Sequence, residues 1–221
     1  SLGDTIAIMP YLNMYAIKND VQIYLKGPKH FSDLFKVTYP SVIFTDRDKK
    51  EFHHIIDIIH DFSKPLQQYM AEQLGFKDDY YYVRPRIDSF KKERPVKNKY
   101  ITFGIHSTLQ MKYWNHPDGE EVQGESLYWN KLSKMLRKSN LTPVCLELNE
   151  SFGVPPHYNV LPKSSVNKTG MDLKEVINYI EHSEFYIGLS SGMAWVAHAL
   201  GKPVAMIANF TEDWNEMGLN E

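Results

Sequence analysis

Apolar residues follow two spacings along this chain, and the spacing predicts where helices and strands form. Short apolar runs between turn residues predict strands, and apolar residues three or four positions apart predict amphipathic helices. Helices are expected at residues 4–18, 30–35, 48–62, 65–75, 126–138 and 172–182, and strands at 21–25, 42–44, 80–83, 100–105, 144–148, 158–161, 185–189 and 204–208. Because strands and helices alternate, the pattern favours an α/β protein with parallel sheets covered on both faces.

A helical pattern runs through residues 48–62, where apolar positions recur with a period of 3.6. The residues of this stripe are Phe52, Ile55, Ile56, Ile59 and Phe62. The next helix is expected to begin at Pro65, because proline suits a first turn, and to end at Gly75, a favoured residue after a helix.

The composition changes near the middle of the chain. With 221 residues, 43% of them hydrophobic and 24% charged, the chain has room for one large domain or two small ones. From residue 85 to residue 99 the sequence becomes charged and contains proline, which favours a linker. We therefore expect an N-terminal domain at 1–86, a linker at 87–99 and a C-terminal domain at 100–221.

Charge and cysteine content exclude several classes of protein. The net charge is -2 and no block of basic residues stands out, so no nucleic-acid partner is expected. The single cysteine, Cys145, lies in an apolar run, which predicts a buried thiol and no internal disulfide or cysteine-based metal site. No stretch resembles a signal peptide or approaches the roughly 18 apolar residues of a membrane span, so the expected compartment is the cytoplasm.

Residues 185–204 predict a strand, a tight turn, a helix and a second strand. The turn contains Ser190, Ser191 and Gly192, and small and apolar residues follow it. The first N–H groups of a helix have no partner within the helix and favour an anion, so this turn is a candidate phosphate site. Trp195 and His198 share one face of the helix, where core packing is the more frequent role for tryptophan.

Two other residues have the chemistry of a transferase site. Asp4 follows Gly3 at a helix start, where it is either the N-cap or a carboxylate that the helix keeps ionised as a base. Lys112 follows the predicted strand 100–105, close in sequence to Ser107 and Thr108. Because α/β folds bind ligands beyond the carboxyl ends of parallel strands, this lysine either neutralises a diphosphate or faces solvent from a loop.

Asp46 and Asp48 suggest a different chemistry. The Asp-X-Asp pattern after the strand 42–44 is similar to the metal-holding pair of GT-A glycosyltransferases. Acidic residues before a helix also stabilise the helix dipole, and the match is only three residues long. No Walker loop, Gly-X-Ser-X-Gly or His-Glu-X-X-His motif occurs, which disfavours several hydrolase and NTPase classes.

Taken together, these segments resemble the ADP-heptose:heptosyltransferase family, glycosyltransferase family 9. Residues 1–6 (SLGDTI) with Pro10 are similar to the opening motif of the family, and residues 190–204 to its donor motif. The resemblance is closer to the branch that O-heptosylates bacterial autotransporter proteins. This branch is similar in its segment corresponding to 107–114 (STLQMKYW) and in its Ser-Ser-Gly turn.

The resemblance implies a GT-B fold, with two Rossmann-like domains facing each other across a cleft. The N-terminal domain would take the acceptor and the C-terminal domain the nucleotide sugar. The implied activity is inverting transfer of a heptose or related sugar from an ADP-sugar to a hydroxyl on a protein or glycan, such as serine, with Asp4 as base and no catalytic metal or cofactor. Donor binding is implied for Ser107, Thr108, Lys112, Met171, Ser190, Ser191, Gly192 and Trp195.

The chain departs from the family at several positions. Lipopolysaccharide heptosyltransferases carry Asp-Thr-Gly and a histidine where this chain has Ser190, Ser191 and Trp195, which favours the protein-modifying branch. The iron-binding cysteine cluster of that branch is absent from these residues, as is the strand expected before Ser1, so we expect the chain to be a fragment. The alternatives are a GT-A transferase using Asp46 and Asp48, or a binding module without activity. The sequence is compatible with an oligomer.

Overall fold

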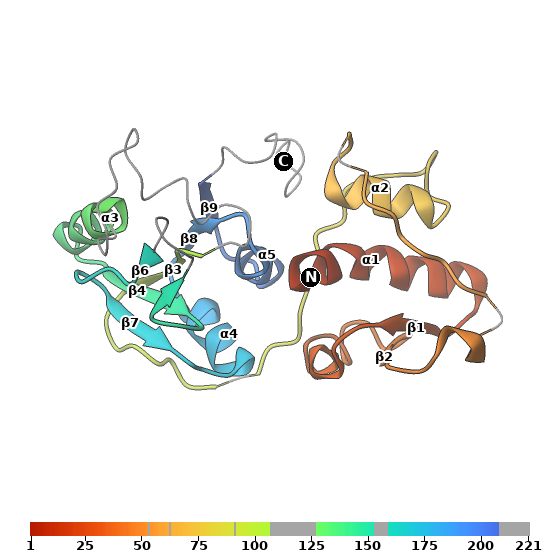
Figure 1. Cartoon of the computed structure of the whole chain (residues 1–221), viewed down its shortest axis with the longest axis horizontal. Helices are drawn as coiled ribbons and strands as arrows, with labels where there is room; N and C mark the ends of the chain where they lie inside the picture. The colour runs from red at the N-terminus through yellow and green to blue at the C-terminus, as the bar shows by residue number, and fades with distance from the viewer. Residues whose placement is uncertain (53, 62, 91, 107–126, 153–158, 208–221) are drawn as a thin grey trace. The chain divides into compact units, whose positions relative to one another are not determined.

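The computed structural model describes residues 1–52, 54–61, 63–90, 92–106, 127–152 and 159–207 (Figure 1). The chain divides into two compact units, of which the first runs from Ser1 to Ser89 and the second begins at Phe90. The sequence-based domain limits, 1–86 and 100–221 with a linker between them, stay a prediction.

The first unit is built around one long helix. Its elements are α1 (Leu2–Asn19), β1 (Ile23–Lys26), the 3-10 helix η1 (Lys29–Leu34), β2 (Val42–Thr45), the 3-10 helix η2 (Lys49–Glu51) and α2 (Leu66–Gln73). Strands β1 and β2 pair in parallel, and α1 packs against α2 and β2 (Figure 1). The predicted apolar side of α1 is buried, with Ile6, Met9 and Leu12 at most 5% exposed. The helix continues through Pro10 and ends at Asp20, which has the left-handed backbone common after helices.

The helix predicted at residues 48–62 is wrong. The structure has only η2 there, and the described residues from 52 to 61 form no regular secondary structure. The side chain of Gln73 accepts a hydrogen bond from the backbone N–H of Ile59 and donates one to its carbonyl, so the backbone here bonds to α2 instead of to a helical turn of its own. Isoleucine is β-branched and also has low helix propensity. The conformation with these two hydrogen bonds is therefore favoured over the helix that the apolar spacing predicts. Ile55 and Ile59 are 46% and 72% exposed.

The strand predicted at 80–83 is also absent. The Tyr11 hydroxyl of α1 donates to the carbonyl of Tyr81 and accepts from the N–H of Val83, both at 3.1 Å. The buried Gln67 of α2 donates to the carbonyls of Ala7 and Val83. The segment therefore finds its hydrogen-bond partners on α1 and α2 rather than on a neighbouring strand.

The second unit is a five-stranded parallel sheet covered by helices. Its strands are β3 (Tyr100–Gly104), β4 (Thr142–Glu147), β7 (Val166–Thr169), β8 (Tyr186–Leu189) and β9 (Val204–Ile207), in the spatial order β7-β4-β3-β8-β9. Its helices are α3 (Leu127–Lys138), α4 (Leu173–His182) and α5 (Gly192–Ala199). Strands β5 (Ser151–Phe152) and β6 (Asn159–Val160) form a separate antiparallel pair. Helix α3 packs on β4, and α5 packs on β8 and β9 (Figure 1).

This strand order marks the edge at which sheets of this kind bind ligands. The first strand of the unit in the chain, β3, lies in the middle, and the chain then builds outward through β4 and β7 before it returns to β8 and β9. Such a doubly wound sheet binds ligands beyond the carboxyl ends of its strands, at the point where the direction of building reverses. In this unit that point lies between β3 and β8, which pair from Thr102↔Tyr186 to Gly104↔Gly188.

The core of the second unit agrees with the apolar runs of its strands. Phe103 stacks on the fully buried Trp129 of α3, with ring centroids 5.5 Å apart. Cys145 is buried, as predicted, and burial raises the pKa of its thiol. Strand β7 had no counterpart in the prediction, because its four residues include Asn167 and Lys168 and form no apolar run. None of the helices in the described ranges combines the length and apolar character needed to cross a bilayer.

Candidate functional site

The predicted anion-binding turn lies at the reversal point of the sheet. Strand β8 ends at Leu189, and α5 begins at Gly192 after two serines. Ser191 is the N-cap residue with an extended backbone, and its side chain makes no capping hydrogen bond. Because the Ser191 side chain does not occupy the N–H groups of the first turn, the N-terminus of α5 keeps the capacity to bind an anion.

The other donor residues predicted in the second unit differ in exposure. Met171 is partly buried and directly precedes Asp172, the N-cap of α4. Trp195 is only 3% exposed, and its ring contacts that of His198 edge-on at 6.1 Å, so the indole packs in the core. Ser107, Thr108 and Lys112 lie outside the described residues. The donor roles of all these residues stay predictions.

Glu147 is a site residue that sequence reasoning missed. It ends β4, and its Oε1 accepts hydrogen bonds from the backbone N–H groups of Ile105 at 2.5 Å and His106 at 2.9 Å. Burial raises the pKa of the Glu147 carboxyl to about 7, although the two N–H groups partly oppose this rise. The only signal in the sequence is its place at the end of a predicted apolar strand.

Tyr186 packs next to this carboxylate, beneath the ends of β3 and β8. Its side chain is fully buried, and a Cβ atom added at Gly104 would lie 2.5 Å from its hydroxyl. A Cβ at Gly188 would lie 2.7 Å from its ring. Burial raises the pKa of the Tyr186 phenol, the charge of Glu147 raises it further, and Ser191 lowers it. Glu147, Tyr186 and the donor turn therefore form one neighbourhood at the carboxyl end of the sheet.

Asp4 is held at the N-terminus of α1. Ser1, not Asp4, is the N-cap, which corrects the structural role that the sequence suggested. The Asp4 carboxylate accepts a hydrogen bond from the backbone nitrogen of Ser1 at 2.9 Å and remains 32% exposed. Burial raises the pKa of Asp4, whereas hydrogen bonding with Ser1 and the neighbouring charge of His60 lower it, so Asp4 is ionised at neutral pH.

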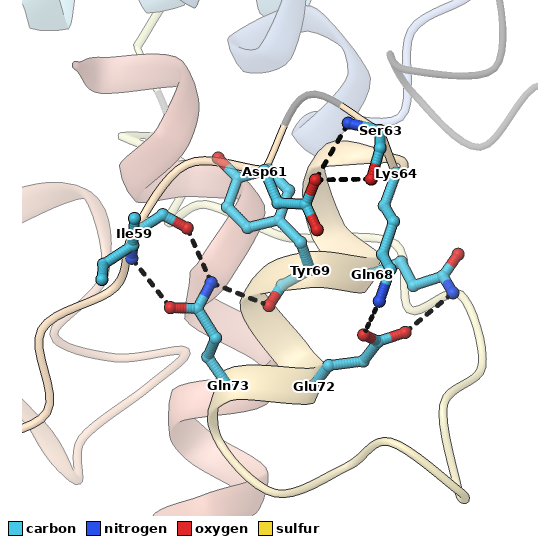
Figure 2. A network of polar contacts seen from close by, with 8 residues as sticks. All are labelled: Ile59, Asp61, Ser63, Lys64, Gln68, Tyr69, Glu72 and Gln73. Atoms are coloured by element: carbon cyan, nitrogen blue, oxygen red, sulfur yellow. Dashed lines mark hydrogen bonds and ion pairs between the residues drawn. The ribbon is translucent and has the colours of Figure 1, made fainter.

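A pocket of about 410 Å³ lies beside α2 in the first unit. Figure 2 shows the polar contacts around it: Asp61 accepts two hydrogen bonds from Ser63, and Glu72 accepts from Lys64 and Gln68. The residues that line it are Ile59, His60, Asp61, Lys64, Tyr69, Glu72, Gln73 and Lys77.

The pocket is electrostatically linked to Asp4. Tyr69 and Nδ1 of His60 are hydrogen-bonded at 2.7 Å. Burial and then the negative charge of Asp4 raise the pKa of Tyr69, and the charge of His60 in turn lowers that of Asp4. His60 and Tyr69 carry no signal in the sequence that points to Asp4, because they become its neighbours only when α2 packs on α1.

The pair Asp46 and Asp48 does not converge on one point. Asp46 forms an exposed ion pair with Lys29 at 2.7 Å, whereas Asp48 caps η2 by accepting from the N–H of Lys50. Within the described ranges, no group of three or more His, Cys, Asp or Glu side chains is placed to hold a metal ion. The geometry therefore does not favour the GT-A alternative.

The chain is an α/β protein whose second unit is a Rossmann-like parallel sheet. No protein-family model matches the chain. The chain is 27% identical to the autotransporter heptosyltransferase Aah of Escherichia coli, over 98% of this chain and 56% of Aah. It thus spans about half the length of this curated relative.

Solved structures identify the fold. The crystal structure of TibC, an iron-containing dodecameric glycosyltransferase from enterotoxigenic E. coli H10407, matches with a TM-score of 0.81 at 23% identity, over 98% of this chain and 57% of TibC. The E. coli heptosyltransferase WaaC with ADP-2-deoxy-2-fluoro heptose matches with a TM-score of 0.56 at 13% identity, over 98% of this chain and 89% of WaaC. The predicted GT-B class is confirmed, and the homologues of this chain are autotransporter heptosyltransferases.

The described residues offer no site for an iron ion. They include one cysteine, which is fully buried among apolar neighbours, and no cluster of metal-binding side chains. Asp4 belongs to the first unit, whereas Met171 and the turn at Ser190–Gly192 belong to the second. That these groups face each other across a cleft stays a prediction.

Proposed function

We propose that the protein containing this chain is an inverting glycosyltransferase that moves a heptose from ADP-heptose to a hydroxyl group of a protein, with serine as the acceptor residue. The observation that carries the proposal is its similarity to autotransporter heptosyltransferases over almost the entire chain. A TibC crystal structure contains ADP-D-β-D-heptose, which supports the choice of donor. A cytoplasmic location is part of the proposal and rests on the sequence alone.

Donor binding is assigned to the second unit. Backbone N–H groups at Ser191 and Gly192 would bind the diphosphate at the N-terminus of α5. Lys112 would neutralise it, helped by Ser107 and Thr108. The remaining predicted contacts are Ser190 and Trp195 near the turn and Met171 at the adenine. The open cap of Ser191 and its place at the reversal point of the sheet support this assignment.

Asp4 is assigned the chemical step. Its carboxylate, ionised at neutral pH, would take the proton of the acceptor hydroxyl as the oxygen attacks the anomeric carbon. The bond between that carbon and the phosphate oxygen breaks, and ADP leaves with the bonding electrons. Amide N–H groups and Lys112 would stabilise the charge that develops on the diphosphate. In this scheme no metal ion takes part in the transfer.

The acceptor is assigned to the first unit. The pocket lined by His60 and Tyr69 is electrostatically coupled to Asp4 and has donors, acceptors and both signs of charge on its walls. A peptide segment with a hydroxyl side chain could therefore be held there by hydrogen bonds to polar side chains and backbone groups.

The test compares Asp4→Asn with Asp20→Asn, a control at the other end of the same helix where asparagine suits the left-handed backbone. Each protein is incubated with ADP-heptose and a serine-rich acceptor protein, and the acceptor mass is measured. Asp4→Asn should lower kcat by about 10²- to 10⁴-fold, because a general base is lost. Its Kd for ADP, measured by calorimetry, should stay near that of the wild type. Full transfer by Asp4→Asn would reject the assignment of the base.

The same assay separates the alternatives. A wild-type protein that binds ADP but never modifies an acceptor would indicate a binding module without activity. Transfer abolished by EDTA and restored by a divalent ion would indicate metal-dependent catalysis, whereas we expect turnover to be unaffected by EDTA.

A further inference from the structure

The carboxyl end of β3 extends beyond its strand partners. The ladder with β4 ends at Phe103↔Cys145, and the ladder with β8 ends at Gly104↔Gly188. The N–H groups of Ile105 and His106 therefore need other acceptors, because a buried N–H without a partner is costly. Oε1 of Glu147 accepts both.

Two consecutive N–H groups that converge on one oxygen form a small concave anion site. Here the anion is an internal carboxylate from the neighbouring strand rather than a ligand. One oxygen atom thereby fixes the direction in which the chain leaves the sheet after β3. His106 is followed directly by Ser107 and Thr108, which the proposed function assigns to the donor diphosphate.

Close packing fixes the same strand ends from below. The buried Tyr186 ring occupies the space that a side chain at Gly104 or Gly188 would need. Strand β8 continues from Gly188 through Leu189 to the donor turn at Ser190. Glu147 from β4 therefore fixes the end of β3. The Tyr186 ring, packed against both Gly104 and Gly188, fixes the distance from there to the donor turn.

We propose that Glu147 is a positioning residue for the nucleotide-sugar donor, acting through the backbone of Ile105 and His106 and not through contact with the donor itself. The proposal rests on the proposed function. Neither the sequence motifs nor the comparisons point to Glu147. It acts through its carboxyl oxygen, which accepts the two hydrogen bonds, and its charge is not required.

The test uses Glu147→Ala and Glu147→Gln, with Glu184→Ala as a matched control. Glu184 is an exposed carboxylate just before β8, at the opposite end of the sheet. The measurements are Kd for ADP by calorimetry, KM for ADP-heptose, KM for the acceptor, and kcat. Glu147→Ala should raise Kd and donor KM about ten- to hundredfold, because a displacement near 1 Å in a binding site has effects of that size. The acceptor KM should not change.

Glu147→Gln should restore most of the donor affinity lost in Glu147→Ala, since its amide oxygen can accept the same two bonds. A purely structural role would lower the amount of folded protein, and hence the apparent kcat, without this split between the two KM values. If Glu147→Ala does not fold, Glu147→Asp tests the same contact with a shorter side chain. In its folded state, amide exchange at Ile105 and His106 should be faster and the donor KM higher.

The outcomes distinguish the two proposals. A wild-type protein that binds ADP, together with Glu147→Ala and Glu147→Asp variants whose donor KM is unchanged, would overturn the positioning role and leave the proposed function intact. A wild-type protein that binds neither ADP nor ADP-heptose would overturn both.

Discussion

Replacing Glu147 by glutamine should make the second unit more stable at pH 8 and leave its stability at pH 5 almost unchanged. Burial raises the pKa of Glu147 from the ordinary 4.5 to about 7, so the folded state holds its proton more tightly than the unfolded state. Between these two pH values the folded state binds more protons, and its stability falls as the pH rises. The penalty is absent below about pH 4.5 and complete above about pH 7.

The magnitude follows from the size of the rise. One pKa unit corresponds to about 1.4 kcal/mol, so a change from 4.5 to about 7 corresponds to about 3 kcal/mol. Glu147 is only partly buried, and solvent screens its charge, so we expect about 1–3 kcal/mol. Glutamine removes the charge while keeping an oxygen for the N–H groups of Ile105 and His106, so the stability gained at pH 8 should approach this value.

The assay is urea unfolding at pH 5, 6, 7 and 8, followed by tryptophan fluorescence. Among the described residues, Trp129 and Trp195 are buried in the second unit, so their share of the emission reports that unit. The difference in unfolding free energy between Glu147→Gln and the wild type should increase from pH 5 to pH 8. Glu184→Gln, an exposed control, should show no such increase. A difference that is the same at all four pH values would refute the reasoning.

Substitutions at Asp88 and Gly188 test how each unit is held together. Asp88 accepts two backbone N–H groups and the Thr38 hydroxyl at 2.6–2.9 Å, so Asp88→Ala should cost about 2–4 kcal/mol and Asp88→Asn less, as measured by urea unfolding. A larger loss for asparagine than for alanine would contradict this explanation. Gly188→Ala should cost about 1–3 kcal/mol, because its Cβ would lie 2.7 Å from the buried Tyr186 ring. Gly27→Ala, whose Cβ would meet only ordinary contacts, should change stability by less than about 0.5 kcal/mol.

The elements that were predicted well have local determinants. The strand at 185–189, the two serines and the helix of small residues after them correspond to β8, the cap at Ser191 and α5. Each signal lies within a few residues of the element that it specifies, so these elements can be predicted from the sequence without knowledge of the tertiary structure. The end of α2 near Gly75 was predicted for the same reason, since this glycine has the positive φ that terminates helices.

The segment before α2 shows where local patterns fail. A 3.6-residue period describes a helix with one apolar face, but a helix forms only where that face has something to pack on. In the structure, Gln73 offers the backbone of Ile59 a partner from fourteen residues further along the chain. A contact of that kind depends on the position of α2 and cannot be inferred from the period of the isoleucines.

Glu147 depends on the sheet even more strongly. In the sequence it is an ordinary residue at a strand end, and its partners lie 41 and 42 residues earlier. It meets them because β3 and β4 are parallel neighbours, whose carboxyl ends lie at the same edge of the sheet. Its charge and its oxygen then have separate consequences, since burial penalises the charge while the oxygen holds two N–H groups. Glu147→Gln removes the charge and keeps the oxygen, whereas Glu147→Ala removes both. The stability of Glu147→Gln and the donor affinity of Glu147→Ala therefore test the same contact independently.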